Sequence, residues 1–296
     1  MLLVIILKLD LDPGTRFSTL VQLLLHLMIF NLCDRKLMFQ LTIENKRKFQ
    51  EDGYLLVEDL YDQEEMDLLL SIGKNDQEKA SLVRAAEDTE GRESKLWLTS
   101  DTDREDIYNA ICHGHRMVDT LEDMMDDEVY LYHYKMMVKE PRVGGAWEWH
   151  QDYGYWYHNK ALYPDMISCY IAVDRAHKGN GCLQVIRGSH RLGRIEHGRF
   201  GTQVGADPER VQLALENLEL EYCEMSPGTA LFFHANLLHR SDPNNSNDPR
   251  WSLICCYNTR HNPCEDRPGH PSYRPLEKWP DKLIKEFGHR QLAKLV

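Results

Sequence analysis

The stretch from residue 126 to residue 258 most constrains the fold of this chain, because short apolar runs alternate there with turn sequences. The run Val129–Val138 alternates strongly, and further runs follow at Trp147–Trp149, Ile167–Val173, Cys182–Ile186, Ala230–Phe233 and Trp251–Tyr257. Turn signals separate them at Gly144-Gly145, Gly179-Asn180-Gly181, Gly188-Ser189, Ser226-Pro227-Gly228 and Asp242-Pro243-Asn244-Asn245. Many short strands at near-regular spacing predict a double-sheet jelly roll.

Helices are expected mainly before this region, so the fold class is mainly β with flanking α-helices. Thr42 is a candidate N-cap for a helix that runs to Gln50 and ends at Asp52-Gly53. The other expected elements are a strand at 54–57, helices at 63–72 and 107–125, an irregular charged segment at 74–106, and a short helix near 282–295.

The first 37 residues differ in texture from the rest of the chain. Charged residues separate the apolar runs at 1–6 and 20–32, no basic region precedes them, and each run is too short to span a bilayer. We therefore expect residues 1–37 to be an N-terminal extension, with Met38 as the functional start. Residues 38–296 are expected to form a single domain, and no membrane span is expected.

Charge and cysteine content limit the partners. With 35 Lys+Arg and 47 Asp+Glu, the net charge is −12, which argues against a nucleic-acid partner. None of the eight cysteines forms a Cys-x-x-Cys pair, so we expect reduced thiols and an intracellular, cytoplasmic protein. A small-molecule substrate is the expected partner, and the oligomeric state stays open.

A candidate metal site begins at His150-Gln151-Asp152. On a strand, residues i and i+2 point to the same face, so His150 and Asp152 could reach one metal. His239 is the leading third ligand, because it ends a strand-like run that follows the Pro227-Gly228 turn. Two imidazoles and one carboxylate on one face of an octahedron are the ligand set of non-haem Fe(II) oxygenases.

Arg250 adds a second feature to this site. It lies eleven residues after His239 and opens the next apolar strand. A guanidinium there could grip a carboxylate bidentately, which suits the distal carboxylate of 2-oxoglutarate. That cosubstrate would fill two open metal positions, and O2 would take the last.

The sequence resembles the phytanoyl-CoA dioxygenase family. The motifs that carry the resemblance are Phe49–Leu55, His150-Gln151-Asp152, Asn180-Gly181-Cys182-Leu183, Gly188-Ser189-His190, and Pro227-Gly228 through His239-Arg240-Ser241 to Arg250. The resemblance covers roughly residues 40–260 and implies a double-stranded β-helix, a cupin-like jelly roll, that binds Fe(II) and 2-oxoglutarate. It implies iron ligation by His150, Asp152 and His239, and a cosubstrate pocket formed by Arg250, Ser241, Gln151, Tyr170 and Lys135.

The resemblance also bears on the reaction and the substrate. Halogenating relatives replace the metal carboxylate by a small residue, so Asp152 favours hydroxylation. The aromatic run Tyr153–His158 is either a substrate wall or a rim that packs on the barrel, and it is similar to that of ectoine hydroxylases. Such a wall would suit a small polar or zwitterionic molecule. A long acyl-CoA would need a basic patch, for which the candidates are Arg187, Arg191, Arg194 and Arg199.

The sequence also allows two alternative functions. The barrel could be a catalytically silent binding protein, or a metal-dependent hydrolase that uses the same residues. Other histidines are expected to be structural: His190 in a turn, His234 on a face opposite to His239, and His113 and His115 facing solvent.

Overall fold

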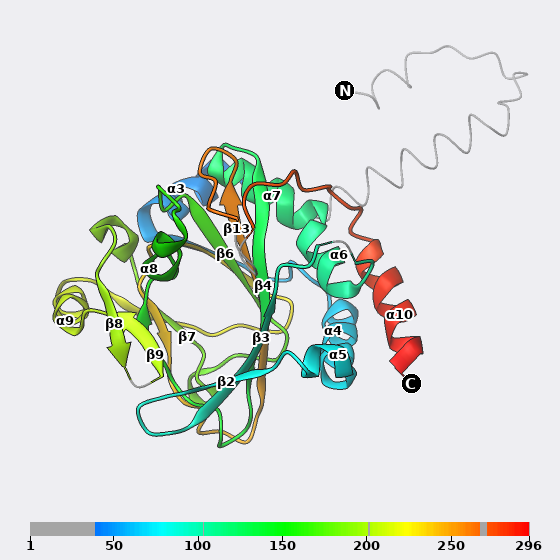
Figure 1. Ribbon diagram of the computed structural model, residues 1–296, viewed down its shortest axis with the longest axis horizontal. Helices are drawn as coiled ribbons and strands as arrows, with labels where there is room; N and C mark the ends of the chain where they lie inside the picture. Colours follow the sequence, from blue (N-terminus) through cyan, green and yellow to red (C-terminus); the bar gives the residue numbers. More distant parts are fainter. Residues whose placement is uncertain (1–38, 103, 201, 267–270, 296) are drawn as a thin grey trace, which may run out of the picture. The chain divides into compact units, whose positions relative to one another are not determined.

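The computed structural model describes residues 39–102, 104–200, 202–266 and 271–295 (Figure 1). The residues from Gln40 onward form one compact unit. The expected extension 1–37 lies outside the described residues, so the boundary at Met38 stays a prediction.

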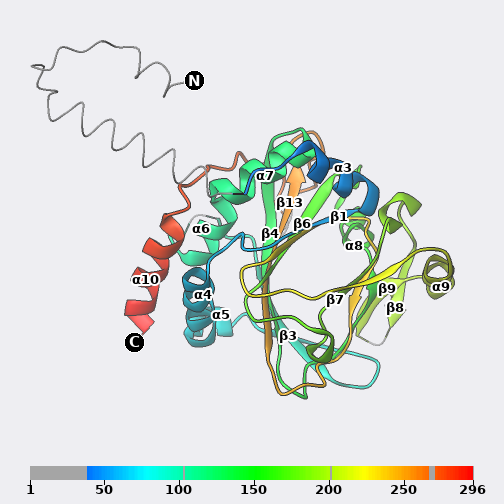
Figure 2. The same cartoon turned by 180° about the vertical axis from the view of Figure 1, so that it is seen from behind.

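Two antiparallel sheets form the core of this unit, with a small third sheet beside them (Figures 1 and 2). The seven-stranded sheet has the order β1-β11-β6-β13-β4-β3-β2, and the four-stranded sheet has the order β10-β7-β12-β5. The strands are β1 (Tyr54–Val57), β2 (Arg84–Glu87), β3 (Glu93–Thr99), β4 (Val129–Lys139), β5 (Trp147–His150), β6 (Met166–Ala172), β7 (Leu183–Ile186), β8 (His197–Phe200), β9 (Gln203–Ala206), β10 (Leu220–Cys223), β11 (Ala230–His234), β12 (His239–Ser241) and β13 (Arg250–Thr259). The predicted double-stranded β-helix is thereby confirmed.

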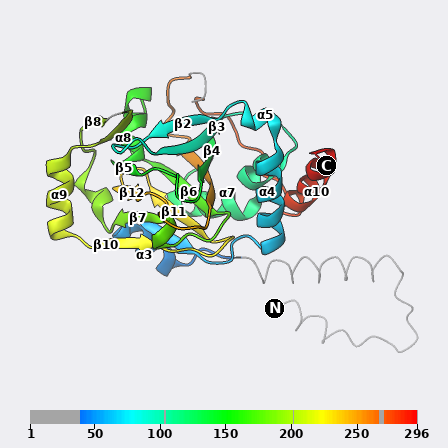
Figure 3. The same ribbon diagram turned by 90° about the horizontal axis from the view of Figure 1, so that it is seen from below.

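Several helices flank the large sheet on one side, and Figure 3 shows α4 and α10 next to each other there, with α9 on the far side of the molecule. The helices are α3 (Ile43–Asp52), α4 (Gln63–Asn75), α5 (Gln77–Ala80), α6 (Ile107–His113), α7 (His115–Met125), α8 (Asp152–Trp156), α9 (Pro208–Asn217) and α10 (Leu283–Leu295). Short 3-10 turns lie at η1 (Tyr157–Asn159), η2 (Lys178–Asn180) and η3 (Ser189–Leu192).

The start of the domain follows its sequence signals. Thr42 caps α3 by accepting a hydrogen bond from the backbone of Asn45, and Gly53 ends the helix at φ 84°. A Cβ at Gly53 would lie 2.4 Å from Nδ1 of His190. His190 contacts the backbone carbonyl of Gln50 through Nε2 at 3.1 Å, which agrees with its expected role in a turn.

The charged segment 74–106 is not irregular, which corrects the prediction. It forms α5 and the hairpin β2–β3, in which β3 pairs with β4 and β2 is the edge strand of the large sheet. Trp97 of β3 is buried, whereas Lys95, two residues earlier, is exposed. The charged residues around β3 obscure its local pattern. The strand forms because it pairs with β4, which comes later in the chain, and local sequence does not reveal this pairing.

The predicted helix 107–125 is divided at Gly114, where the backbone bonds Trp279 of the C-terminal segment. His113 is buried, its Nδ1 lies 2.8 Å from the carbonyl of Glu277, and its ring stacks on Trp279. The expectation that His113 faces solvent is therefore wrong. The C-terminal segment around Trp279 buries His113, and the sequence near His113 does not indicate this distant contact.

The run that leads to His239 also differs from its prediction. It is not one strand: β11 ends at His234 in the seven-stranded sheet, and β12 begins at His239 in the four-stranded sheet. Because the chain crosses from one sheet to the other here, His239 points into the barrel, whereas the His234 ring lies against His190. The elements β8, β9, α9 and β10 were not predicted.

The cysteines of the described part of the chain (Cys112, Cys169, Cys182, Cys223, Cys255, Cys256 and Cys264) are all buried free thiols. Among the described residues, we find no helix that is long and apolar enough to cross a membrane.

Candidate metal and cosubstrate site

His150, Asp152 and His239 converge between the two sheets, with one potential ligand atom of each within 4.8 Å of the others. Nε2 of His150 and Nε2 of His239 each lie 4.0 Å from Oδ1 of Asp152. His150 ends β5 and pairs directly with His239 of β12, so strand pairing brings the two imidazoles together. Asp152 is the first residue of α8 and does not lie on the strand, which corrects the expected geometry.

Backbone carbonyls orient both imidazole rings. Nδ1 of His150 lies 2.7 Å from the carbonyl of Glu148, and Nδ1 of His239 lies 2.9 Å from that of Leu237. Each Nδ1 therefore carries the proton that it donates, which leaves the Nε2 lone pair facing the carboxylate. Burial lowers the pKa of both histidines, and for His150 the neighbouring His239 lowers it further. Neutral imidazoles are the form that binds a metal.

Asp152 is held as a carboxylate. Its burial by itself would raise its pKa, but the positive charge of Lys135 and the other polar neighbours lower the pKa overall. Oδ2 accepts a hydrogen bond of 2.5 Å from Oγ of Ser168, which leaves Oδ1 toward the histidines. Two neutral imidazoles and one carboxylate fit a divalent iron with open positions. Ser168 was missed, because an inward serine on a strand carries no motif.

A cavity of about 390 Å³ contains the three ligands and most of the expected cosubstrate residues. Lys135, Tyr170, Ser241 and Arg250 all line it. They come from β4, β6, β12 and β13, which lie in two different sheets. The structure therefore places these four residues around one cavity, where the resemblance implied a cosubstrate pocket.

Arg250 lies at the buried start of β13, and its guanidinium donates to the carbonyl of Gly181. Its charge lies 5.9 Å from the ring centre of Tyr170. Among the described residues, neither Nε of Arg250 nor the hydroxyl of Tyr170 has a hydrogen-bond partner, although both are buried. Buried donors without partners in a cavity suit an anionic ligand such as a dicarboxylate.

Lys139 supports this end of the site and was not predicted. Its side chain is fully buried, and Nζ donates to Oγ of Ser241 at 2.8 Å and to the carbonyl of Asp242 at 2.6 Å. Burial lowers its pKa well below the ordinary value, and the positive charge of Arg250 lowers it further. Lys139 could have been found from the alternation of β4, since it shares a face with Lys135.

Gln151 does not contribute to the cavity, contrary to the expectation. Its amide nitrogen donates to the carbonyls of Gly193 and Asn236, and its oxygen accepts from the backbone of Ile195. All three contacts are 2.7–2.8 Å long. Gln151 therefore fixes loops behind the metal ligands, because its side chain turns away from the neighbouring His150 and Asp152.

The aromatic run after Asp152 is divided between the cavity wall and the core. Tyr155 and Trp156 line the cavity, whereas Tyr153 packs into the core and donates to the carbonyls of Ala161 and Leu162. Trp147 also lines the cavity and was not predicted to do so. The wall thus combines aromatic faces with Leu96 and Leu98 of the β3 strand.

The basic patch considered for an acyl-CoA is occupied by acidic partners at two positions. Arg187 contacts Asp52 at 2.7 Å and Glu219 at 3.4 Å, and Arg194 contacts Glu196 at 2.6 Å. These ion pairs reduce the positive charge that phosphate groups would require.

A double-stranded β-helix that joins a His-x-Asp…His site to a buried arginine defines an Fe(II)- and 2-oxoglutarate-dependent dioxygenase, as expected from the sequence. Residues 49–252 match the phytanoyl-CoA dioxygenase (PhyH) family, and the chain belongs to this family. The predicted enzyme class and its cofactors are thereby confirmed.

The sequence identities to individual relatives are low. An L-proline trans-4-hydroxylase of Streptomyces griseoviridis is 30% identical over 176 residues, which are 54% of this chain and 64% of that protein. An ectoine dioxygenase of Bordetella parapertussis is 24% identical over 237 residues, which are 75% and 77% of the two chains. The crystal structure of EctD from S. alaskensis with 2-oxoglutarate and 5-hydroxyectoine aligns with a TM-score of 0.69 at 21% identity, over 81% of this chain and 89% of EctD. This last similarity supports the fold.

Proposed function

We propose that this protein hydroxylates a small polar molecule and releases succinate and CO2. The observation that carries the proposal is that the three candidate iron ligands and Arg250 share one cavity. When bound, Fe(II) and 2-oxoglutarate supply the oxidising chemistry: O2 provides one oxygen atom to a substrate C–H bond and one to succinate.

The roles of the residues follow from their places in the cavity. His150, Asp152 and His239 hold the iron. Arg250 and Ser241 bind the distal carboxylate of 2-oxoglutarate. Lys135 and Tyr170 lie along the cosubstrate, and Lys139 positions Ser241 through its hydrogen bond to Oγ. Gln151 is not assigned a cosubstrate contact, because its side chain is used by backbone groups.

Cavity size and lining limit the substrate. About 390 Å³ is at the small end of ligand pockets, roughly 300–1,000 Å³, and 2-oxoglutarate must share it. The space that remains suits a molecule of amino-acid size. Tyr155 and Trp156 offer aromatic faces to a ring or a cationic group. The relatives named for proline and ectoine act on molecules of this kind.

The test is a screen for succinate formation that depends on added substrate. Purified protein with Fe(II), 2-oxoglutarate and O2 is offered amino acids including L-proline, then ectoine, amines and acyl-CoAs. We expect stimulation by a small zwitterionic molecule, lost in Asp152→Ala and retained in Asp248→Ala, whose side chain is 71% exposed. Absence of stimulation by every class, or hydrolysis that is independent of iron, would overturn the proposal.

A further inference from the structure

The segment 157–165 follows the cavity wall of α8 and carries Asn159, which also lines the cavity. Several of its large side chains remain outside the core: Tyr157, Leu162 and Tyr163 are 47%, 72% and 48% exposed. Apolar burial therefore contributes little to holding this segment in place. Its position must depend largely on polar contacts.

Tyr153 and Tyr132 supply some of these contacts, through the carbonyls of Ala161 and Leu162 and the Asn159 side chain. Others come from the segment 260–265, which follows β13. The Asn262 side chain accepts from the backbone of Tyr163 at 2.9 Å and donates to its carbonyl at 2.7 Å. The backbone of Glu265 donates to the carbonyl of Asn159 at 3.0 Å, and its carboxylate pairs with Lys160 at 2.8 Å. The segment after β13 thus holds the loop that completes the cavity wall.

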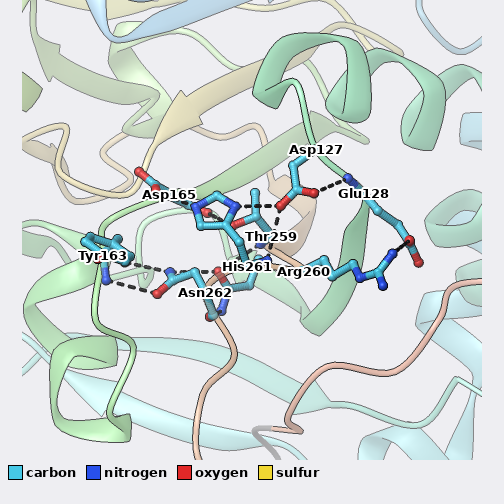
Figure 4. A network of polar contacts seen from close by, with 9 residues as sticks. Asp127, Glu128, Tyr163, Asp165, Thr259, Arg260, His261 and Asn262 are labelled. Carbon is cyan, nitrogen blue, oxygen red and sulfur yellow. Dashed lines mark hydrogen bonds and ion pairs between the residues drawn. The ribbon is translucent and has the colours of Figure 1, made fainter.

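His261 lies at the centre of this network (Figure 4). Its Nδ1 lies 2.6 Å from Oδ2 of Asp127, and its Nε2 lies 2.9 Å from Oδ2 of Asp165. Asp127 precedes β4, and Asp165 precedes β6. Since a carboxylate only accepts hydrogen bonds, both ring nitrogens must carry protons for the two contacts to form. This geometry requires an imidazolium.

We propose that His261 is a positioning residue for the substrate side of the cavity: its charged form bridges Asp127 and Asp165 and so holds the segment 157–165. The inference rests on the proposed function, because it assigns the substrate to the wall formed by Trp156 and Asn159. His261 touches no reacting group; it acts through the backbone that carries Asn159.

Proton loss should release this bridge. The hydrogen bonds with Asp165 and Asp127 raise the pKa of His261 above its ordinary value. The bridge is therefore complete at lower pH and is lost as the pH rises through that raised pKa. The ring centre of Tyr163 lies 6.3 Å from that of His261. The charged groups nearby are paired: Arg260 with Glu128, and Lys160 with Glu265, while the Tyr273 hydroxyl also bonds Glu128.

Hydrogen exchange measured by mass spectrometry tests the proposal on the protein loaded with Fe(II) and 2-oxoglutarate without O2. Protection factors of the peptide covering 157–165 are compared between pH 6 and pH 9. Wild type should lose protection as the pH rises, on the order of tenfold because a charge-assisted contact is lost at a half-exposed site. His261→Gln should be poorly protected at both pH values.

Two further variants separate positioning from simple loss of a contact. His261→Arg keeps a cation that does not titrate, so it should remain protected at both pH values. His115→Gln is the matched control, because His115 also contacts an aspartate, Asp119 at 3.2 Å, but away from this segment. Equal protection of 157–165 in wild type and His261→Gln at pH 6 would overturn the proposal.

A second readout distinguishes this proposal from the proposed function. The visible absorption band of the anaerobic Fe(II)–2-oxoglutarate complex should be the same in wild type and His261→Gln. If the band is absent in wild type, the proposed function fails. If the band is present and the exchange of 157–165 does not change with pH or with His261→Gln, only the role of His261 fails.

Discussion

His150 and His239 are direct cross-strand neighbours on β5 and β12, and their ring centres lie 4.1 Å apart. The two residues are far apart in the sequence, yet one strand pairing places both Nε2 atoms at Asp152 Oδ1. The pairing belongs to the four-stranded sheet, whereas Lys135, Ser168 and Arg250 belong to the seven-stranded sheet. The site therefore exists only when both sheets have formed.

Removing the carboxylate should abolish the site. In Asp152→Ala the two histidines lose the anionic partner that lies 4.0 Å from each, so we expect loss of the Fe(II)–2-oxoglutarate absorption band. Substrate-dependent succinate formation should fall by about 100-fold or more, since a primary metal ligand is gone. Anaerobic titration and metal analysis measure this. A band of wild-type intensity in Asp152→Ala would contradict the assignment of the ligand.

Ser168 should matter for iron affinity without being a ligand. Its Oγ donates to Oδ2 of Asp152 at 2.5 Å, and Ser168→Ala removes this orienting bond. Loss of such a partner costs roughly 10- to 100-fold in metal affinity. Fe(II) titration measures the change, and Ser252→Ala is the control because Oγ of Ser252 has no hydrogen-bond partner among the described residues. Equal affinities in the two variants would show that the bond is without effect.

Arg250 should determine affinity for 2-oxoglutarate. Replacement by Met removes a buried cation and its bidentate geometry, and we expect KM for 2-oxoglutarate to rise by about 10- to 100-fold. Arg250→Lys should recover part of the loss, because it restores the charge without the planar geometry. Arg47→Met serves as control, because the Arg47 side chain is 55% exposed and does not line the cavity. An unchanged KM in Arg250→Met would place the carboxylate elsewhere.

His234 should limit stability in acid. Burial and the nearby His190 lower its pKa to about 4. The unfolded chain, with a pKa of about 6.5, then binds a proton that the folded chain excludes. Above pH 6.5 His234 is neutral in both states and does not reduce the free energy of unfolding. As the pH falls from 6.5 toward 4, the free energy of unfolding decreases by up to about 3 kcal/mol.

Urea unfolding at several pH values measures the effect. His234→Asn keeps an acceptor near the backbone of Asn236, which donates to Nδ1 of His234 at 3.0 Å. The variant should lose less stability than wild type between pH 6.5 and 4. His289→Asn, at a histidine whose side chain is 60% exposed, should follow wild type. Identical pH dependence in wild type and His234→Asn would contradict the prediction.

Local sequence patterns were enough to predict the jelly-roll class, the first helix and strand, and the candidate metal ligands and Arg250, which the structure brings into one cavity. These features have local signals: Thr42 and Gly53 bound a helix, and a His-x-Asp pair followed by a distant histidine and arginine is a rare combination. Apolar alternation from residue 129 was strong enough to locate most strands of the barrel.

Tertiary structure decided what depends on distant partners. The strand β3 exists because β4 pairs with it, and His113 is buried because Trp279 covers it. Gln151 lies between two metal ligands in sequence, but loops at Gly193 and Asn236 draw its side chain away. The helix start at Asp152 and the crossing from β11 to β12 likewise result from closure of two sheets around one cavity. Long-range pairing and burial decide these features, and local sequence does not encode them.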